Sequence, residues 1–162
     1  MSDDHLATLL FEQETGVRFR HVHAEGIPEA VAAMLGGHVD VTFGNVGDIY
    51  ATLLLSGQAR ALAVAHPERS EFLPDVPTLR ELGIPVVASA TRGIVVPRGT
   101  PEHIMNKLEQ VFADAMATPE HIERMKAVGM TINPMRREEY GRFYRETQQV
   151  FAPLVEAARR AQ

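Results

Sequence analysis

The sequence predicts an α/β fold in which short strands alternate with helices of moderate length. Apolar residues make up 45% of the 162 residues and charged residues 23%, as in ordinary globular proteins that bury a core. Segments with the helical period alternate with segments of period two or of continuous apolar character. Glycines punctuate the boundaries between these segments: Gly16, Gly36, Gly37, Gly57, Gly83, Gly99 and Gly129.

The first predicted helix runs from Ser2 to Gly16, and a strand follows at about 17–23. The Ser2 hydroxyl can accept a hydrogen bond from the first turn, and Gly16 tolerates the left-handed conformation that ends many helices. We expect this helix to carry one stripe made of Leu6, Leu9, Leu10 and Gln13.

Two further helix and strand pairs are predicted in the first 65 residues. Pro28 suits the first turn of a helix, and Asn45 is a good cap for the next one. The strand at 39–43 alternates with period two. The strand at 60–65 is almost wholly apolar, as in a strand buried on both faces of a parallel sheet. The expected order is αβαβαβ, with helix 28–35, strand 39–43, helix 46–56 and strand 60–65.

The rest of the chain predicts a surface loop at 66–77, a short helix ending at Gly83 and then helices with clear starts. Thr100 and Thr118 each precede Pro-Glu, which is the order of N-cap, first-turn proline and first-turn acid. Pro153 is expected to kink or split the C-terminal helix. The other expected elements are strands at about 86–88, 94–96 and 130–133, and helical stripes at 104–116, 120–129 and 140–155.

Charge and composition exclude several classes of function. Sixteen Lys and Arg against twenty-one Asp and Glu give a net charge of −5 without a basic cluster, so we expect no nucleic-acid partner. The absence of cysteine removes disulfides and thiolate chemistry. No apolar run approaches the roughly 18 residues of a membrane span, and the acidic start of the chain does not predict a secretory signal.

No motif for catalysis, nucleotide binding or metal binding is evident. His21 and His23 share one face of a predicted strand, with His38 near the mouth of the next, but further ligands are not visible, so we expect ordinary surface histidines and no metal. Ser56 and Ser89 lack a nucleophile elbow, and glycine-rich phosphate loops are missing. We therefore expect neither an enzyme nor a cofactor.

Two loops at predicted strand ends are the candidate ligand site. Residues 24–27 precede the helix that begins near Pro28, and residues 44–47 precede the next helix. Ligands of open α/β sheets sit at the carboxyl ends of strands, where helix N-termini offer unpaired N–H groups to an anion. A small carboxylate would fit there, although both loops also suit plain turns.

The chain resembles the periplasmic solute-binding receptors of the tripartite tricarboxylate transporters, often called Bug-type receptors. The resemblance covers nearly the whole chain and depends on the order and spacing of several short motifs. They are His5-Leu-Ala, Thr15-Gly16, His21-Val-His-Ala-Glu-Gly26, Ala33-Met-Leu-Gly-Gly-His-Val-Asp-Val41, Phe43-Gly-Asn45, Gly57-Gln-Ala-Arg-Ala-Leu-Ala-Val64, Arg69-Ser70, Leu73-Pro-Asp-Val-Pro-Thr78 and Pro97-Arg-Gly-Thr-Pro101.

The resemblance implies a two-lobed fold like the type 2 periplasmic binding proteins. Residues 1–88 would form one nearly complete lobe, lobe two, and residues 89–162 the crossover and the returning C-terminal part of lobe one. Such a receptor captures a small organic carboxylate and delivers it to a membrane permease, without catalysis. The ligand-binding residues implied are Ala24, Glu25, Gly26, Ile27, Gly44, Asn45, Val46, Ser89, Thr91 and Arg92.

The sequence departs from the family pattern beside this site. Glu25 stands where the family has a lysine, Gly44 where it has an aspartate, and Thr91-Arg92 where it has an aromatic pair. Arg92 can supply the positive charge that Glu25 removes, because its planar fork suits a carboxylate. The resemblance also implies that a signal peptide and the first units of lobe one are missing from the chain.

Three expectations follow from that missing part. With half of the contacts, about 4 of the roughly 8 kcal/mol needed for micromolar binding would remain, so the chain alone should bind at roughly millimolar concentration. Unpaired apolar segments such as 94–96 should favour self-association. Localisation should be periplasmic, as in the family. Two alternatives stay open: an effector-sensing module of the same fold, or an interaction protein whose ligand site has decayed.

Overall fold

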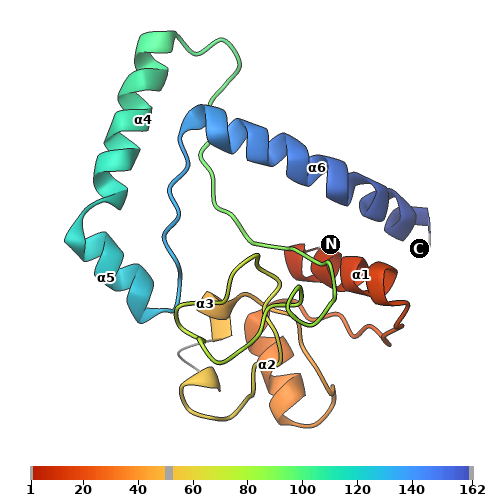
Figure 1. The fold of residues 1–162 in the computed structure, drawn as a ribbon. Helices are drawn as coiled ribbons and strands as arrows, with labels where there is room; N and C mark the ends of the chain where they lie inside the picture. Colours follow the sequence, from red (N-terminus) through yellow and green to blue (C-terminus); the bar gives the residue numbers. More distant parts are fainter. Residues whose placement is uncertain (1, 50–52, 161–162) are drawn as a thin grey trace. The chain divides into compact units, whose positions relative to one another are not determined.

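A computed structural model describes residues 2–49 and 53–160 of the chain (Figure 1). The chain divides into two compact units, Met1–Ala90 and Thr91–Gln162, and each is described by itself. Within residues 2–49 and 53–160, three helices lie in the first unit and three in the second. They are α1 (Asp3–Thr15), α2 (Ile27–Leu35), α3 (Val46–Ile49), α4 (Glu102–Met116), α5 (Pro119–Ala127) and α6 (Arg137–Arg160).

The first helix has the predicted ends but a different buried face. The backbone N–H of His5 donates to the Ser2 hydroxyl at 3.2 Å, and Gly16 ends the helix with φ of +71°. The buried residues of α1 are Thr8, Leu10 and Glu12. Of the expected stripe, Leu10 is buried and Leu6 and Leu9 are half-buried, whereas Gln13 is exposed. A polar threonine and a carboxylate on the inner face predict that α1 packs against hydrogen-bonding partners.

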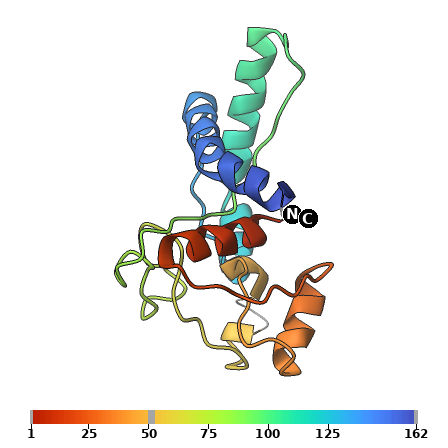
Figure 2. The same ribbon diagram turned by 90° about the vertical axis from the view of Figure 1, so that its right-hand side faces the viewer.

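The second and third helices begin where the sequence predicts. α2 has Pro28 in its first turn and spans almost the predicted range. α3 begins directly after Asn45 but is described only to Ile49, and positions 50–52 of the predicted helix lie outside the described residues. Figure 2 shows the long connection that leads from α1, in red, to α2, in orange.

The predicted strands do not form ladders within residues 2–49 and 53–160. One isolated parallel bridge pairs Val64 with Thr78, and it lies in the expected strand 60–65. The Val64 N–H donates to the Pro77 carbonyl at 3.0 Å, and the Leu79 N–H donates to the Val64 carbonyl at 2.9 Å. The Ala88 N–H also donates to the Ala65 carbonyl at 2.8 Å, but no second bridge forms among the described residues. A strand exists only through a series of such bonds to a neighbour. The strand ranges were therefore right as apolar segments and wrong as paired strands.

The core of the first unit surrounds this bridge. Its buried apolar side chains come from the segments on either side of the bridge, from α1 and from the turn before Gly57: Leu10, Leu53, Val64, Leu79 and Val86. Leu53 and Val86 are each only 1% exposed. Among the described apolar residues of the second unit, Leu154 is the one that is buried. The first unit therefore has a core of its own, whereas the second buries little.

The proline-rich loop 66–77 is fastened to the bridge by a hydrogen-bonded ion pair. The Arg69 guanidinium donates to both carboxylate oxygens of Glu81 at 3.0 Å and to the Pro74 carbonyl at 3.0 Å. The Thr78 N–H donates to Glu81, and the Glu81 N–H donates to the Thr78 hydroxyl. These reciprocal bonds form a capping box over a single turn that ends at Gly83, so the short helix expected there is reduced to that turn.

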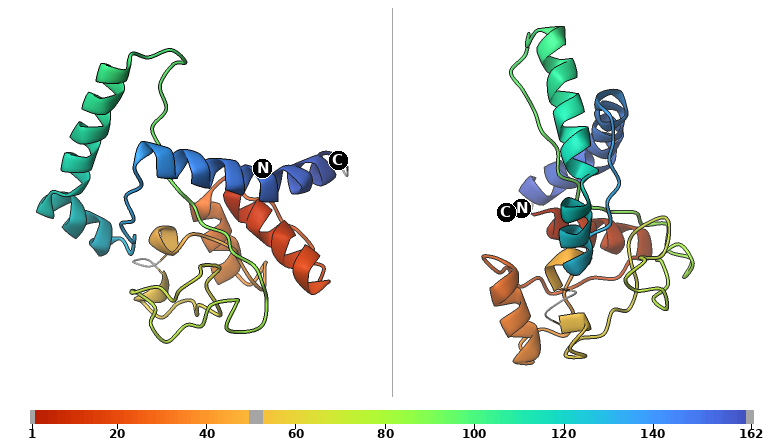
Figure 3. Two further views of the ribbon diagram at one scale, coloured as in Figure 1. Left: turned by 45° about the horizontal axis from the view of Figure 1, so that its top comes forward. Right: turned by 90° about the vertical axis from the view of Figure 1, so that its left-hand side faces the viewer.

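Of the two caps predicted in the second unit, the structure confirms one. Thr118 caps α5, because its hydroxyl accepts from the His121 N–H. Thr100 is not the cap of α4, since Pro101 takes that position and the Thr100 hydroxyl donates to the Pro97 carbonyl. α6 is one continuous helix with Pro153 inside it, so of the two expected effects of this proline the split is wrong, and the kink stays a prediction. Figure 3 shows α4 and α5 as consecutive helices that meet at an angle.

α6 is held to α4 by Arg137 at the first position of the helix. Its guanidinium donates to Glu102 at 2.7 Å, and its backbone N–H donates to Glu109 at 3.0 Å.

No helix in the described part of the chain is long and apolar enough to cross a membrane.

Candidate functional site

Three phenylalanines fix the segments that lead to the two candidate loops. The ring of Phe11 on α1 lies 5.9 Å from the Phe19 ring and 5.8 Å from the Phe43 ring, between centroids. Phe19 and Phe43 are 5.9 Å apart and nearly perpendicular. Edge-to-face packing of this kind is favourable beyond the burial of area. The cluster therefore holds residues 17–23 and 39–43 against α1.

The loop 24–27 ends at the N-terminus of α2 and offers backbone donors. The Glu25 N–H donates to the Glu29 carboxylate at 2.7 Å, and Gly26 is the N-cap residue. For the N–H groups of Gly26, Ile27 and Glu29, the described part of the chain supplies no acceptor. These donors and the helix dipole favour an anion. The Glu29 carboxylate already occupies one position of this kind, so an incoming carboxylate would compete with it.

The loop 44–47 is fastened to the start of α1. The Asn45 side-chain amide donates to an oxygen of Asp3 at 3.3 Å. Gly44 is exposed, and Asn45 and Val46 are half-buried. Asp3 was not among the sequence candidates. It lies 42 positions before Asn45, and nothing in the sequence pattern predicts that the two residues meet. The structure thus ties both candidate loops to α1, one through Phe43 and Asp3 and the other through Phe19.

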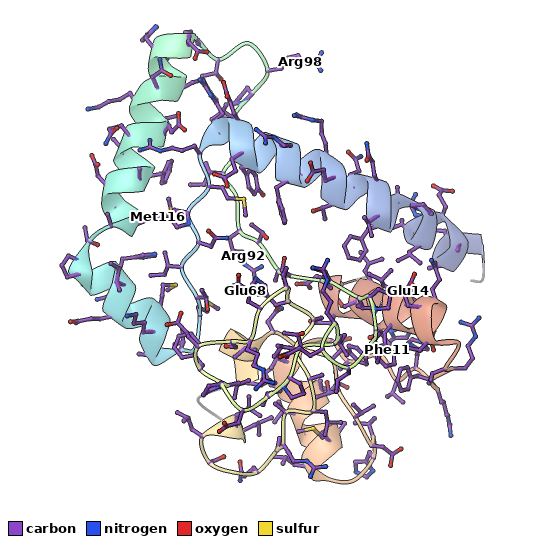
Figure 4. All side chains as sticks on the ribbon, viewed as in Figure 1. Phe11, Glu14, Glu68, Arg92, Arg98 and Met116 are labelled. Atoms are coloured by element: carbon purple, nitrogen blue, oxygen red, sulfur yellow. The ribbon has the colours of Figure 1, made fainter. Side chains whose placement is uncertain are left out.

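The remaining candidates are Ser89, Thr91 and Arg92. Ser89 is exposed and belongs to the first unit, whereas Thr91 and Arg92 belong to the second. Figure 4 labels Arg92 and Arg98 on the stretch that leads to α4. The Arg92 side chain is exposed, and no hydrogen bond to a described residue engages it. It is therefore a free cation of the kind that binds a carboxylate.

A cluster of three histidines lies directly before the loop 24–27. The His5 ring on α1 lies 5.3 Å from the His21 ring and 5.1 Å from the His23 ring, between centroids. His21 and His23 are 6.4 Å apart and share one side of the segment, as predicted. The third imidazole is His5 and not His38, whose ring lies close to Gly36. No group of three His, Asp or Glu side chains within residues 2–49 and 53–160 is arranged to hold a metal ion.

Glu12 is the carboxylate of this cluster and is almost fully buried. One of its oxygens lies 3.1 Å from His21 Nε2 and accepts from the Phe19 N–H at 2.6 Å. Its other oxygen lies 3.9 Å from the exposed Arg18 guanidinium, and the Glu12 side chain is only 6% exposed. Burial, followed by the neighbouring His23 and His21, lowers the pKa of His5 from its ordinary value of 6.5. The surroundings of His5 therefore favour the neutral form of its imidazole.

Sequence analysis missed the residues that build this support. His5 and Glu12 lie on one face of α1, because positions 5 and 12 are two helical turns apart, and Phe11 lies beside that face. Phe19, His21 and His23 alternate along the next segment and meet that face. The sequence signal for this contact was that a helix face with polar and aromatic residues is followed by a segment that alternates with period two. An interpretation based on apolar stripes alone does not detect it.

The fold is that of periplasmic solute-binding proteins. Over 96% of this chain it superposes on 54% of a TctC solute-binding protein from Polaromonas, with a TM-score of 0.81 and 28% identity. A Rhodopseudomonas palustris protein solved with adipate gives a TM-score of 0.74 and 27% identity over 98% of this chain and 52% of its own. MatC from Rhodopseudomonas palustris, solved with bound malate, gives 0.67 and 31% over 78% of this chain and 43% of its own.

The chain belongs to the family of tripartite tricarboxylate transporter receptors, whose model matches residues 1–159. Among curated proteins, it is 34% identical to the UPF0065 protein in the gbd 5' region of Cupriavidus necator, over 158 residues. That alignment covers 96% of this chain and 47% of the relative. The chain thus spans about half the length of the relatives it matches.

Proposed function

We propose that this chain is a ligand-binding part of a receptor for small organic carboxylates. The observation that carries the proposal is the set of N–H groups at the start of α2, next to Gly26, that have no acceptor among the described residues. A carboxylate at this position would accept charge-assisted hydrogen bonds, which are roughly twice as strong as neutral ones. Ala24, Glu25 and Ile27 complete this loop, and Gly44, Asn45, Val46 and Ser89 are the other candidates in the first unit.

Support for the chemical class of the ligand comes from the similar structures. One was solved with adipate and another with malate, and both ligands are dicarboxylates. In the second unit, Arg92 is a further candidate for carboxylate binding, because its side chain is exposed and no hydrogen bond to a described residue engages it. Delivery to a permease of a tripartite tricarboxylate transporter, location in the periplasm and a receptor without catalysis are parts of the same proposal, supported by membership of the family.

The loop at Gly26 allows a sharp test of the proposal. Gly26 has φ of 170°, which any residue adopts, and a methyl group added there meets only the Pro28 ring at an ordinary 3.7 Å. The Gly26→Ala variant should therefore fold normally while placing a methyl group beside the donors. We expect malate or adipate to shift the melting temperature of the unaltered chain and to shift that of Gly26→Ala less.

The matched control is Gly141→Ala in α6, where the nearest atom to an added methyl group is the flexible end of Arg145. This control should respond to ligand like the unaltered chain. An equal response of all three proteins would place binding elsewhere and contradict the proposed site. We expect a Kd of roughly millimolar magnitude for the chain alone, so the screen must extend to such concentrations.

A second candidate is an interaction protein of the same fold that no longer binds a carboxylate. Glu29 favours this second candidate. Its carboxylate accepts a hydrogen bond from the Glu25 N–H, at the place where a ligand carboxylate would bind. Glu25 adds a further negative charge in this loop. If no carboxylate stabilises the chain even when Glu29 is replaced by Gln, this second candidate takes the place of the first.

A further inference from the structure

The histidine cluster joins two segments of the first unit. His5 belongs to α1, and His21 and His23 belong to the segment that runs directly into the loop 24–27. The three rings lie within 5.1 to 6.4 Å of one another, between centroids. Imidazoles at these separations interact strongly once more than one of them is charged.

The charges around the cluster compensate only one added proton. Glu12 is the carboxylate within reach of His21, and it already accepts from Phe19 and faces Arg18. Among the described residues, Glu12 is the carboxylate for which a contact with these rings is given, and Arg18 adds a positive charge beside it. Like charges on more than one ring of the cluster would therefore repel each other at these separations.

We propose that the His5, His21 and His23 cluster is a pH-sensitive latch, which holds residues 17–23 on α1 when its imidazoles are neutral and releases them when more than one is protonated. The lowered pKa of His5 has the sign that this latch requires. A histidine whose pKa is lower in the folded state stabilises the fold above pH 6.5, and that contribution is lost as the pH falls through the lowered pKa.

Release would act on the candidate ligand site through chain connectivity. His23 is followed at once by Ala24, and the Phe19 N–H bond to Glu12 anchors the same segment four residues earlier. Control of ligand capture by this latch rests on the proposed function, whereas the latch itself does not. Its test is therefore made without ligand, so that failure of the latch and failure of the receptor proposal remain distinguishable.

The experiment measures hydrogen exchange of the Phe19 amide by NMR between about pH 7.5 and about pH 5. After correction for the intrinsic pH dependence of exchange, we expect protection of the Phe19 amide to fall by about tenfold or more across this range, which corresponds to at least one pKa unit of coupling. Unchanged protection would overturn the proposal. The C-terminal amides of α6 provide an internal reference, because no imidazole contact involves them.

Two variants separate the latch from a general effect of acid. His5→Phe keeps a ring on α1 and removes a titrating group, so the loss of Phe19 protection should become at least severalfold smaller. His103→Gln changes an exposed histidine of α4 and should leave the pH dependence unaltered. If His5→Phe retains the full pH dependence, or if His103→Gln removes it, the assignment to this cluster is wrong. Far-UV circular dichroism at neutral pH checks that both variants fold.

Discussion

Thr78 and Glu81 exchange hydrogen bonds: the Thr78 N–H donates to the Glu81 carboxylate at 2.6 Å, and the Glu81 N–H donates to the Thr78 hydroxyl at 3.1 Å. The same threonine is bridged to Val64 and is only 2% exposed. Within the family motif that ends at Thr78, this residue therefore has a structural role. It connects the proline-rich loop to the core of the first unit.

Removing the hydroxyl should destabilise the first unit. Thr78→Ala removes the acceptor of the Glu81 N–H, and the loss of a capping hydroxyl costs about 1 kcal/mol. Urea unfolding followed by circular dichroism measures the change. Thr131→Ala, at an exposed threonine in the second unit, is the matched control and should change stability by no more than about 0.5 kcal/mol. Equal effects of the two substitutions would show that the capping box contributes nothing.

Acid should weaken the same loop in a separate pH range. The hydrogen bond from Arg69, followed by that from the Thr78 N–H, lowers the pKa of Glu81 from its ordinary value of 4.5. A carboxyl whose pKa is lower in the folded state stabilises the fold above its ordinary pKa, and the contribution is lost as the pH falls below it. Glu81→Gln should therefore lose stability at neutral pH and show a smaller further loss below about pH 4.5. A melting-temperature profile of both proteins tests this, and parallel profiles would contradict it.

Two leucines near each other in sequence should respond very differently to truncation. Leu53 is 1% exposed, and Leu55 is 65% exposed. Leu53→Ala leaves a cavity in the core of the first unit and should cost about 2–5 kcal/mol, whereas Leu55→Ala should cost less than about 0.5 kcal/mol. Chemical denaturation measures both values. Similar costs would mean that the core is not centred on the Val64 bridge.

Arg92 should contribute to carboxylate binding. Arg92→Ala removes the free cation assigned to the ligand and should abolish measurable binding of malate or adipate, while Arg98→Ala, at another exposed arginine of the same stretch, should not. Ligand-observed NMR suits the weak affinity that we expect. Unchanged binding by Arg92→Ala would end the assignment of this residue.

We propose that the second unit associates with another copy of the chain through the stretch 91–97. Ile94 is 60% exposed and Val95 is 87% exposed, and no backbone hydrogen bond among the described residues engages positions 89–96. β-Branched residues with unpaired backbone groups favour strand addition. Light scattering after size exclusion should give a mass above that of the monomer, and Val95→Glu should reduce it.

The control for association is Leu82→Glu, at a leucine of the first unit that is 54% exposed. It adds the same charge outside the proposed surface and should leave the mass unchanged. A monomeric mass for the unaltered chain at all concentrations would contradict self-association.

Local signals in the sequence predicted the helices well. Ser2, Thr118 and Gly16 act through hydrogen bonds and backbone preferences within one turn, so their effects are independent of the rest of the fold. Thr100 is not the cap of α4, because its hydroxyl donates to the Pro97 carbonyl instead. Capping preferences alone do not predict which of two possible hydrogen-bond partners a threonine hydroxyl takes.

The strands were predicted less well, for a different reason. A helix satisfies its own backbone, but a strand depends on a neighbour that the sequence does not specify. Val64 has one in Thr78, whereas Val95 has none among the described residues.

The helix starts beside the candidate loops were predicted, and the role of these loops in ligand binding stays a prediction. The loops and Asn45 followed from the position of helix starts, but Glu29, which covers one of the donors, and Asp3, which holds Asn45, depend on tertiary contacts. The histidine pair was seen in the sequence, and its third member, His5, was not, because α1 brings it there from a distant position.

The most direct test of the central claim is an NMR titration of the uniformly labelled chain with malate, with adipate and with an uncharged diol of similar length. The account predicts saturable shifts of the Gly26, Ile27 and Glu29 amides with each dicarboxylate, at a Kd of roughly millimolar magnitude, and none with the diol. Absence of saturable shifts at these amides, or equal shifts with the diol, would contradict a carboxylate receptor built on this loop. A micromolar Kd would contradict the weak affinity expected of the chain alone.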